Sequence, residues 1–176
     1  MEILQIESAE DVVLIADEHY FHTNIIEYEK RPFADVEEMN KALIKNHNML
    51  VRKYHTVYHL GDFSLSNLAN SAKILEQLNG THILVMGNHD RQRTRSWWKK
   101  VGFTEVYRTP VRFMYDDITV VLSHEPLDVY NCINIHGHSH SKAGSFPFYD
   151  ADVHRCISVE KTGYHPMPLS IIISYF

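Results

Sequence analysis

Five short apolar runs in this 176-residue chain are each followed directly by side chains that can bind a metal ion or transfer a proton. The clearest run is residues 83–86, four apolar and partly β-branched residues that predict a buried strand. Open α/β sheets hold their ligands at the carboxyl ends of their strands. The repeated pattern of apolar run and polar side chains therefore predicts strands that lie side by side, with their carboxyl ends at one edge, which we call the rim. The five runs and the residues after them are 12–16 with Asp17 and His19, 57–60 with Gly61-Asp62, 83–86 with Gly87-Asn88-His89-Asp90, 119–122 with Ser123-His124, and 133–135 with His136-Gly137-His138-Ser139-His140. Taken alone, the third motif fits a turn and a helix cap equally well.

The pattern along the chain predicts an α/β fold in one domain spanning residues 1–176. Alternating strand and helix patterns come first and consecutive strands later, which favours a mixed sheet or two stacked sheets with helices outside. We expect Asp35 to cap its helix, with Glu38 completing a capping box, and Ser64 or Ser66 to cap the next one. Residues 1–6 are expected to pair beside 12–16 as an edge strand. Further strands are predicted at 56–60, 83–86, 104–107, 111–114, 118–122, 133–135, 156–159 and 169–175, and helices at 24–30, 35–52, 64 or 66 to 78, and 91–100.

Composition narrows the class of protein. The formal net charge of −5 argues against a dedicated nucleic-acid coat protein, although a bound metal could still attract a nucleotide. Cys132 and Cys156 lie in apolar runs and are expected to be reduced and buried. No secretory signal or membrane span is visible, so we expect a cytoplasmic protein without membrane partners. The chain holds 13 histidines, many near the ends of apolar runs, which favours metal binding or proton transfer.

The ligand types at the predicted rim limit the metal. Imidazole, carboxylate and amide groups without a thiolate suit Mn²⁺, Fe, Zn²⁺ or Ni²⁺ rather than a structural cysteine–zinc site. Seven such side chains exceed what one tetrahedral ion needs, but they suffice for two ions if one carboxylate bridges them. Two ions about 3.5–4 Å apart stabilise the attacking and leaving oxygens of a displacement at phosphorus.

These five motifs, in this order from residue 17 to residue 140, resemble the motif set of the calcineurin-like metallophosphoesterases. The stretch from Asp17 to Asn24, with Arg31-Pro32-Phe33 after it, further resembles small bacterial and phage members. The resemblance implies a four-layer αββα sandwich of two mixed β-sheets flanked by helices. It also implies two divalent ions, Mn²⁺ first among Ni²⁺, Fe, Zn²⁺ and Mg²⁺, with a metal-bound hydroxide as nucleophile. The implied roles are Asp17, His19 and His140 for the first metal, Asn88, His124 and His138 for the second, Asp62 as the bridge, His89 facing the scissile ester, and Asp90 orienting His89.

Departures from the family pattern narrow the expected activity. The Asp-Arg-Gly of protein phosphatases and dinucleoside polyphosphatases is absent after Gly61-Asp62, and no insertion large enough for a cap domain is present. We therefore expect a small phosphoesterase acting on a phosphate ester, with a phosphodiester favoured over a monoester and a nucleotide as one such substrate. Two alternatives stay open: a non-catalytic metal-binding or protein-interaction module on the same fold, and a nuclease acting on nucleic acid.

Several other residues have two interpretations each. His22 and Asn24 follow the first motif closely and are candidates for substrate binding, but Asn24 could instead cap a helix. Arg91 is a third candidate for substrate contact. The basic stretch around Trp97-Trp98 indicates a solvated helix face with one buried Trp more often than a nucleic-acid site. His59 and His136 lie inside strands and favour structural roles, and the loop 141–152 is either a wall beside the metals or a packed connection.

Overall fold

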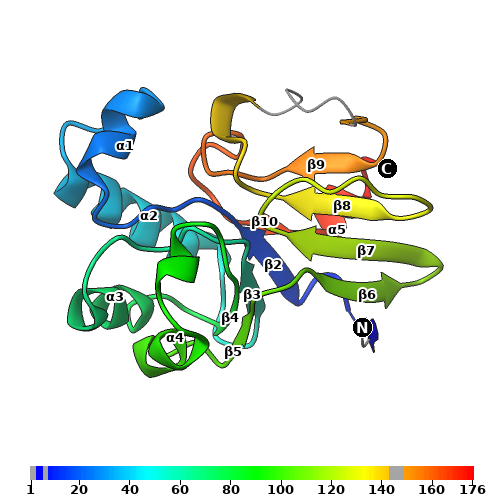
Figure 1. Ribbon diagram of the computed structural model, residues 1–176, viewed down its shortest axis with the longest axis horizontal. Helices are drawn as coiled ribbons and strands as arrows, with labels where there is room; N and C mark the ends of the chain where they lie inside the picture. The colour runs from blue at the N-terminus through cyan, green and yellow to red at the C-terminus, as the bar shows by residue number, and fades with distance from the viewer. Residues whose placement is uncertain (1–2, 6–7, 143–148) are drawn as a thin grey trace.

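Two five-stranded mixed sheets stack face to face in the computed structural model, which describes residues 3–5, 8–142 and 149–176. The first sheet has the strand order β10-β2-β3-β4-β5 and the second the order β1-β6-β7-β8-β9. Figure 1 shows helices α1–α4 on one side, the first sheet in the middle and the second sheet on the other side. The predicted α/β sandwich of two mixed sheets flanked by helices is confirmed.

The first sheet is built from βα units. Parallel strands need crossover connections, and helices α1–α4 provide them between successive strands and cover the outer face. The short strand β10 runs antiparallel beside β2 and makes the sheet mixed. The elements are β2 (Val12–Ile15), α1 (Thr23–Tyr28), α2 (Val36–Leu50), β3 (Thr56–His59), α3 (Leu68–Leu75), β4 (Thr81–Val85), a 3-10 turn η1 (Asp90–Gln92), α4 (Arg95–Val101), β5 (Glu105–Tyr107) and β10 (Met167–Pro168).

Helix caps agree with the sequence in one place and differ in another. The Asp35 carboxylate accepts a hydrogen bond from the Glu38 N–H, so the predicted cap of α2 is confirmed. Glu38 reaches back to the N–H of Ala34 rather than to that of Asp35. The cap of α3 is Asn67, because the helix begins one residue beyond the predicted serines. Asn24 lies inside α1 and does not cap it.

The second sheet begins with a hairpin and continues with parallel strands. Strands β6 and β7 are antiparallel around Asp116-Asp117, and Asp116 takes a left-handed conformation in that turn. Strands β7, β8 and β9 are parallel to one another. The elements are β1 (Ile3–Gln5), β6 (Val111–Tyr115), β7 (Ile118–Ser123), β8 (Ile133–His136), a 3-10 turn η2 (His140–Lys142) and β9 (His154–Cys156).

Two predicted strands were placed wrongly. Residues 3–5 do form an edge strand, but β1 pairs with β6 in the second sheet rather than with β2. The segment predicted as a strand at 169–175 is helix α5 (Leu169–Ile173). Leu169 and Ile172, three positions apart, are buried while Ile171 is exposed, which is helical periodicity too short to recognise in so apolar a run.

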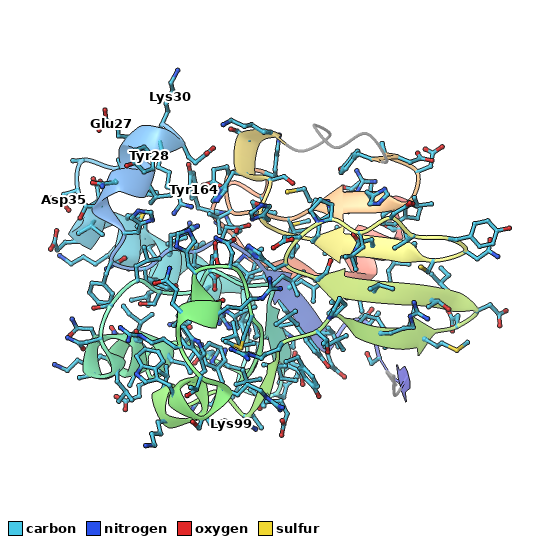
Figure 2. The ribbon with its side chains drawn as sticks, in the orientation of Figure 1. Glu27, Tyr28, Lys30, Asp35, Lys99 and Tyr164 are labelled. Atoms are coloured by element: carbon cyan, nitrogen blue, oxygen red, sulfur yellow. The ribbon has the colours of Figure 1, made fainter. Side chains whose placement is uncertain are left out.

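Two hydrophobic cores hold the layers together, and β2 contributes to both. Val13 and Ile15 pack toward the helices, whereas Val12 and Leu14 pack between the sheets. A strand buried on both faces needs a continuous apolar run, which is what residues 12–16 supply. Charged side chains such as Glu27 and Lys99 project from the outer sides of the helices (Figure 2). None of the helices in the described part of the chain is both long and apolar enough to cross a membrane.

Candidate metal centre

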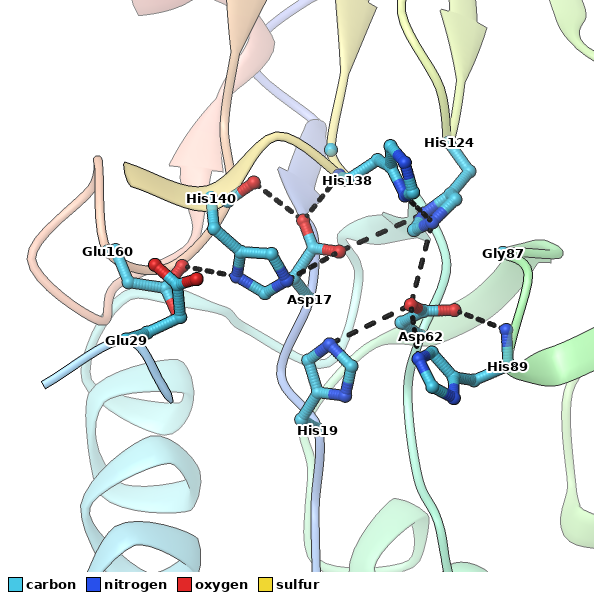
Figure 3. Close-up of polar contacts among 12 residues, drawn as sticks. Asp17, His19, Glu29, Asp62, Gly87, His89, His124, His138, His140 and Glu160 are labelled. Atoms are coloured by element: carbon cyan, nitrogen blue, oxygen red, sulfur yellow. Dashed lines mark hydrogen bonds and ion pairs between the residues drawn. The ribbon is translucent and has the colours of Figure 1, made fainter. Parts of the chain in front are cut away.

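Asp17, His19 and His140 come together at the rim where β2 and β8 end. Their ligand atoms all lie within 4.8 Å of one another, and the Nε2 atom of His140 is 3.8 Å from Oδ1 of Asp17 (Figure 3). Oδ1 of Asp17 and Nε2 of His19 are buried and have no hydrogen-bond partner among the described residues. Orphaned buried polar atoms are costly, and a cation between them would satisfy both.

Asp62, directly after β3 and Gly61, lies at the middle of the rim. Its Oδ2 atom is 3.7 Å from Nε2 of His19 on one side and 3.5 Å from Nε2 of His124 on the other. Its Oδ1 atom accepts a hydrogen bond from the backbone N–H of His89 at 3.0 Å. One oxygen is therefore held by the protein, and the other faces both groups of histidines, as a bridging ligand must.

Asn88, His124 and His138 form the second group, at the ends of β4, β7 and β8. Oδ1 of Asn88 is 2.9 Å from Nε2 of His124 and 3.1 Å from Nδ1 of His138. The two histidine nitrogens are themselves 3.1 Å apart. His124 also lies with Asp17 and Asp62 in a group whose ligand atoms are within 4.8 Å of one another, so the two halves of the site are continuous.

The backbone at this rim takes conformations that most residues avoid. Positive φ angles of 43–66° occur at five of the seven predicted ligands: Asp17, His19, Asp62, His138 and His140. Non-glycine residues held there carry strain, and such strain clusters at functional sites. Glycines make the close approach possible: a Cβ on Gly87 would clash with Asp62, and one on Gly137 would come within 2.6 Å of Oδ2 of Asp17.

Hydrogen bonds to groups that are not themselves ligands fix the orientation of the ligand side chains. Nδ1 of His124 lies 2.8 Å from the Leu60 carbonyl, which accepts its proton and leaves Nε2 free for a metal. Oδ2 of Asp17 accepts from the Ser158 hydroxyl at 2.6 Å and from the His138 N–H at 2.8 Å, so Oδ1 alone points into the site.

Glu160 holds His140 in the same way. Its Oε2 atom is 3.0 Å from Nδ1 of His140, and its Oε1 atom is 2.6 Å from Nη2 of the buried Arg31. Arg31 also donates to the carbonyls of Asp17 and Glu18, which ties the first motif to the segment that carries Glu160. A carboxylate behind a metal-binding histidine is a common support for such sites.

The electrostatics of the rim favour a bound cation. Burial raises the pKa of Asp17 to about 6 and raises that of Asp62, and the nearby histidines only partly offset the effect. Burial also lowers the pKa of His19 well below its ordinary value and lowers that of His124, so both favour the neutral form that binds metal. Burial acts in the same direction on His140, but its hydrogen bond to Glu160 and the Asp17 charge outweigh burial and raise its pKa. The donor set, the orphaned atoms and the buried carboxylates all fit divalent metal ions.

His89 lies beside the predicted ligands, whereas Asp90 makes contacts other than the predicted one. The His89 imidazole is partly exposed, with Nε2 3.9 Å from Oδ2 of Asp62 and its ring centroid 5.4 Å from that of His19. Asp90 does not contact that imidazole. Its carboxylate accepts from the backbone N–H groups of Asp62, Phe63 and Gly87, so the predicted orienting contact is wrong and Asp90 holds two of the ligand loops together.

The three candidate substrate-binding residues differ in how close they lie to the metal centre. His22 lies beside the site, with Nδ1 3.3 Å from Nδ1 of His19. Asn24 is exposed on α1 and makes no hydrogen bond to the ligands among the described residues. Arg91 is exposed, with Nη1 3.4 Å from Oε1 of Glu125, and lines a small cavity beside His124.

The basic stretch and the strand histidines follow the structural interpretation. Trp98 is buried and Trp97 half-buried, beside exposed basic side chains. His59 and His136 are fully buried with hydrogen-bond partners in the protein. Half of the loop 141–152, residues 143–148, lies outside the described residues.

Ser158 and Glu160 were not singled out from the sequence, although a signal for them exists. They alternate with Ile157 and Val159 directly after β9, where a strand run was predicted. The rule that polar residues after an apolar run belong to the rim would have found them.

Fold and site together define an α/β protein of two stacked mixed sheets with buried His and Asp groups that could bind metal ions at the strand ends. No protein-family model matches the chain. The chain is 39% identical over 175 residues to MJ1445, an uncharacterized protein of Methanocaldococcus jannaschii, a match covering 94% of this chain and 91% of that protein. The chain belongs to the family of that protein.

Two solved structures resemble this one to different degrees. AQ665 of Aquifex aeolicus, a protein of unknown function, has a TM-score of 0.76 and 28% identity, with 94% of this chain and 98% of that chain covered. A novel archaeal phosphodiesterase has a TM-score of 0.44 and 20% identity, with 84% and 81% covered. The second likeness is too slight to support a functional argument.

Proposed function

We propose that the protein is a calcineurin-like metal-dependent phosphoesterase that prefers phosphodiesters to phosphomonoesters. The observation that carries the proposal is the position of Asp62, whose Oδ2 atom lies between His19 of one ligand group and His124 of the other. A protein that only used the fold for binding would not need a bridging carboxylate between two sets of metal-ligand side chains. The diester preference rests on the absence of a cap domain in the sequence.

Seven of the residues would bind metal ions, and one further side chain, that of His89, would face the substrate. Asp17, His19 and His140 would hold one divalent ion and Asn88, His124 and His138 a second, with Asp62 shared and Mn²⁺ as the ion we expect. When bound, the ions would polarise phosphoryl oxygens and lower the pKa of water toward neutrality. His89 is partly exposed at the mouth of the site and makes no hydrogen bond through its ring among the described residues.

We infer that His89 serves the leaving group. In hydrolysis the oxygen of water joins phosphorus, the phosphorus–oxygen ester bond breaks, and the departing oxygen needs a proton. An imidazole can donate and accept protons near neutral pH. Among the described residues, His89 is the histidine at this rim whose ring is neither in the ligand set nor hydrogen-bonded to another side chain. We therefore assign proton donation to His89, and positioning of Asp62 and Gly87 to Asp90.

A panel of phosphodiesters, phosphomonoesters, cyclic nucleotides and oligonucleotides, each with Mn²⁺, Ni²⁺, Zn²⁺ or Mg²⁺, tests the proposal. Asp62→Ala should lose both bound metal and turnover, because it removes the shared ligand. His89→Ala should keep the metal while turnover falls by about 10²-fold or more. Loss of metal in His89→Ala would contradict the division of roles, and a wild-type protein that binds none of the four ions would overturn the proposal.

A nuclease is the second candidate function. Arg91, Arg93, Arg95 and Lys100 are exposed on the segment that follows His89 in the sequence. Cleavage of oligonucleotides with a rate that falls steeply with salt would favour this candidate, since phosphate contacts release counterions.

A further inference from the structure

A cavity of about 150 Å³ opens beside His89, on the side of the rim formed by β3, η1 and α4. Its lining includes Ser64, Ser66, His89, Gln92, Arg93 and Trp97. His89 belongs both to this cavity and to the candidate metal centre, where its Nε2 atom lies 3.9 Å from Oδ2 of Asp62. A group in the cavity would therefore be one side chain away from the site of chemistry.

The cavity is large enough for one planar ring and has an aromatic wall against which such a ring can stack. A void of this volume takes a benzene-sized molecule. Trp97 forms one wall, and its ring stands nearly perpendicular to that of Trp98, with centroids 4.6 Å apart. Trp98 is buried and donates its indole N–H to the Asp90 carbonyl at 3.0 Å, so the surface behind Trp97 is fixed to the same loop as the site.

The Trp97 face already carries a planar group. The guanidinium carbon of Arg93 lies 5.3 Å from the Trp97 ring centroid. Arg93 is exposed, so a planar ligand can replace it at the cost of one exposed cation–π contact, or lie beside it. No acidic side chain is among the residues that line the cavity, which suits a ligand that carries phosphate.

The remaining wall is polar and can recognise the edge of a ring. The Gln92 amide offers a donor and an acceptor and makes no side-chain hydrogen bond among the described residues. Ser64 already accepts from Ser66 N–H and Ser71 Oγ, which leaves its hydroxyl proton to be placed toward a ligand. A planar ring whose edge carries both donors and acceptors is typical of a nucleobase, since a phenyl ring lacks such groups and a sugar ring is not planar.

We propose that this cavity is a subsite for the nucleobase of the substrate, so that the natural ester is a nucleotide-type phosphate ester with its base against Trp97. The inference rests on the proposed function for the link between base and scissile bond, because His89 joins the two. The subsite itself can be tested without any reaction.

Metal-free protein in chelator is titrated with adenosine, guanosine, cytidine and uridine 5′-monophosphates, and with ribose 5-phosphate, which lacks the base. Binding is followed by ligand-observed NMR. We expect at least one nucleotide to bind at least tenfold more tightly than ribose 5-phosphate. Trp97→Leu should weaken that nucleotide by about tenfold or more, as loss of a base–aromatic stack does, and Trp97→Phe should restore most of it. Tyr175→Leu, which removes an exposed aromatic ring from a different cavity, is the matched control and should change nothing.

A second variant guards against misfolding of Trp97→Leu. Gln92→Ala changes an exposed side chain and should alter the order of preference among the four nucleotides. Equal binding of all four nucleotides and ribose 5-phosphate, or no response to either substitution, would overturn the subsite. Base-dependent binding without hydrolysis of any ester would overturn the proposed function and leave the subsite standing, whereas hydrolysis without base preference would do the reverse.

Discussion

Two clusters of buried histidines in this protein show how differently one residue type can be used. One cluster is the candidate metal centre at the strand ends. The other is formed by His47 of α2, His59 of β3 and His82 of β4, whose ring centroids lie 5.2–6.3 Å apart between the helices and the first sheet. The three histidines of the inner cluster are buried, whereas in the metal centre His19 and His124 are buried and His138 and His140 are partly exposed.

Most ring nitrogens of the inner cluster have partners within the protein. Nδ1 of His59 contacts Oε1 of Glu18 at 2.5 Å, its Nε2 atom lies 3.0 Å from Nδ1 of His82, and Nε2 of His82 faces the Leu78 carbonyl. Nε2 of His47 faces the Asn79 carbonyl at 2.9 Å. These residues lie in regular helix and strand, and Nδ1 of His47 is buried without a hydrogen-bond partner among the described residues. Five of the seven rim ligands instead sit at positive φ, and Oδ1 of Asp17 and Nε2 of His19 lack a partner. The inner histidines are bonded mainly to one another and to neighbouring groups of the core, whereas the rim brings Asp17, His19 and His140 together around one point.

The largest effect expected from the comparison is on stability in the inner cluster. His47→Ala should lower the free energy of unfolding by about 2–4 kcal/mol, because it opens a cavity and leaves the Asn79 carbonyl unpaired. Metal affinity should stay within about threefold of wild type. Urea unfolding of the metal-free protein and Mn²⁺ titration check the two halves. A tenfold loss of affinity would mean that the two clusters are coupled and that the distinction fails.

The next effect is on metal affinity without loss of stability. Glu160→Gln should weaken metal binding by about 10–100-fold, because a neutral amide holds His140 less strongly than a carboxylate does. Calorimetric titration with Mn²⁺ measures the change, and Glu37→Gln, on an exposed turn of α2, is the matched control. An unchanged affinity would show that Glu160 supports the fold through Arg31 rather than the metal through His140.

The third effect, the smallest at any one pH step, is a pH dependence carried by one inner histidine. Burial lowers the pKa of His47 to about 3, against an ordinary value of 6.5 in the unfolded chain. Because the folded pKa is depressed, the stability that neutral His47 contributes is present above pH 6.5 and is lost as pH falls toward 3. Substitution of His47 should therefore lower the free energy of unfolding by less in acid than at neutral pH.

The experiment compares wild type with His47→Gln in the metal-free state. The destabilisation by His47→Gln should shrink by about 1.4 kcal/mol for each pH unit between pH 6 and pH 4. Urea unfolding at four pH values gives the slope. A difference independent of pH would mean that His47 is protonated in the fold, and the inner cluster would then be no better satisfied than the rim.

Much of the rim was predictable because its members follow apolar runs. Asp17, His19, Asp62, Asn88, His124, His138 and His140 all follow such runs, the resemblance to metallophosphoesterases implied that they are the ligands, and the structure brings them together. Asp90 has the same position in the sequence, but its carboxylate turns inward to three backbone N–H groups. The direction of one side chain after a turn depends on what the neighbouring strand offers, and no local pattern contains that.

The fold shows the same division. The parallel strands with crossover helices were predictable, since a strand buried on both faces is apolar throughout and helices repeat their own period. The partner of β1 and the helical state of residues 169–173 were not, because both depend on contacts distant in sequence. Short apolar segments have little preference of their own, so packing decides their state.

By itself the amino-acid sequence determined the α/β class, the order of the elements as far as β8, and the ligand types that follow each strand. Only the tertiary structure decided which atoms of those ligands are left without a partner and that Asp62 lies between the two ligand groups. It also brought Ser158 to Asp17, 141 residues away in the chain, and Glu160 to His140, 20 residues away. The physical reason is that residue types and their periodicity are local properties. Burial, strain and unpaired atoms arise only when distant segments meet.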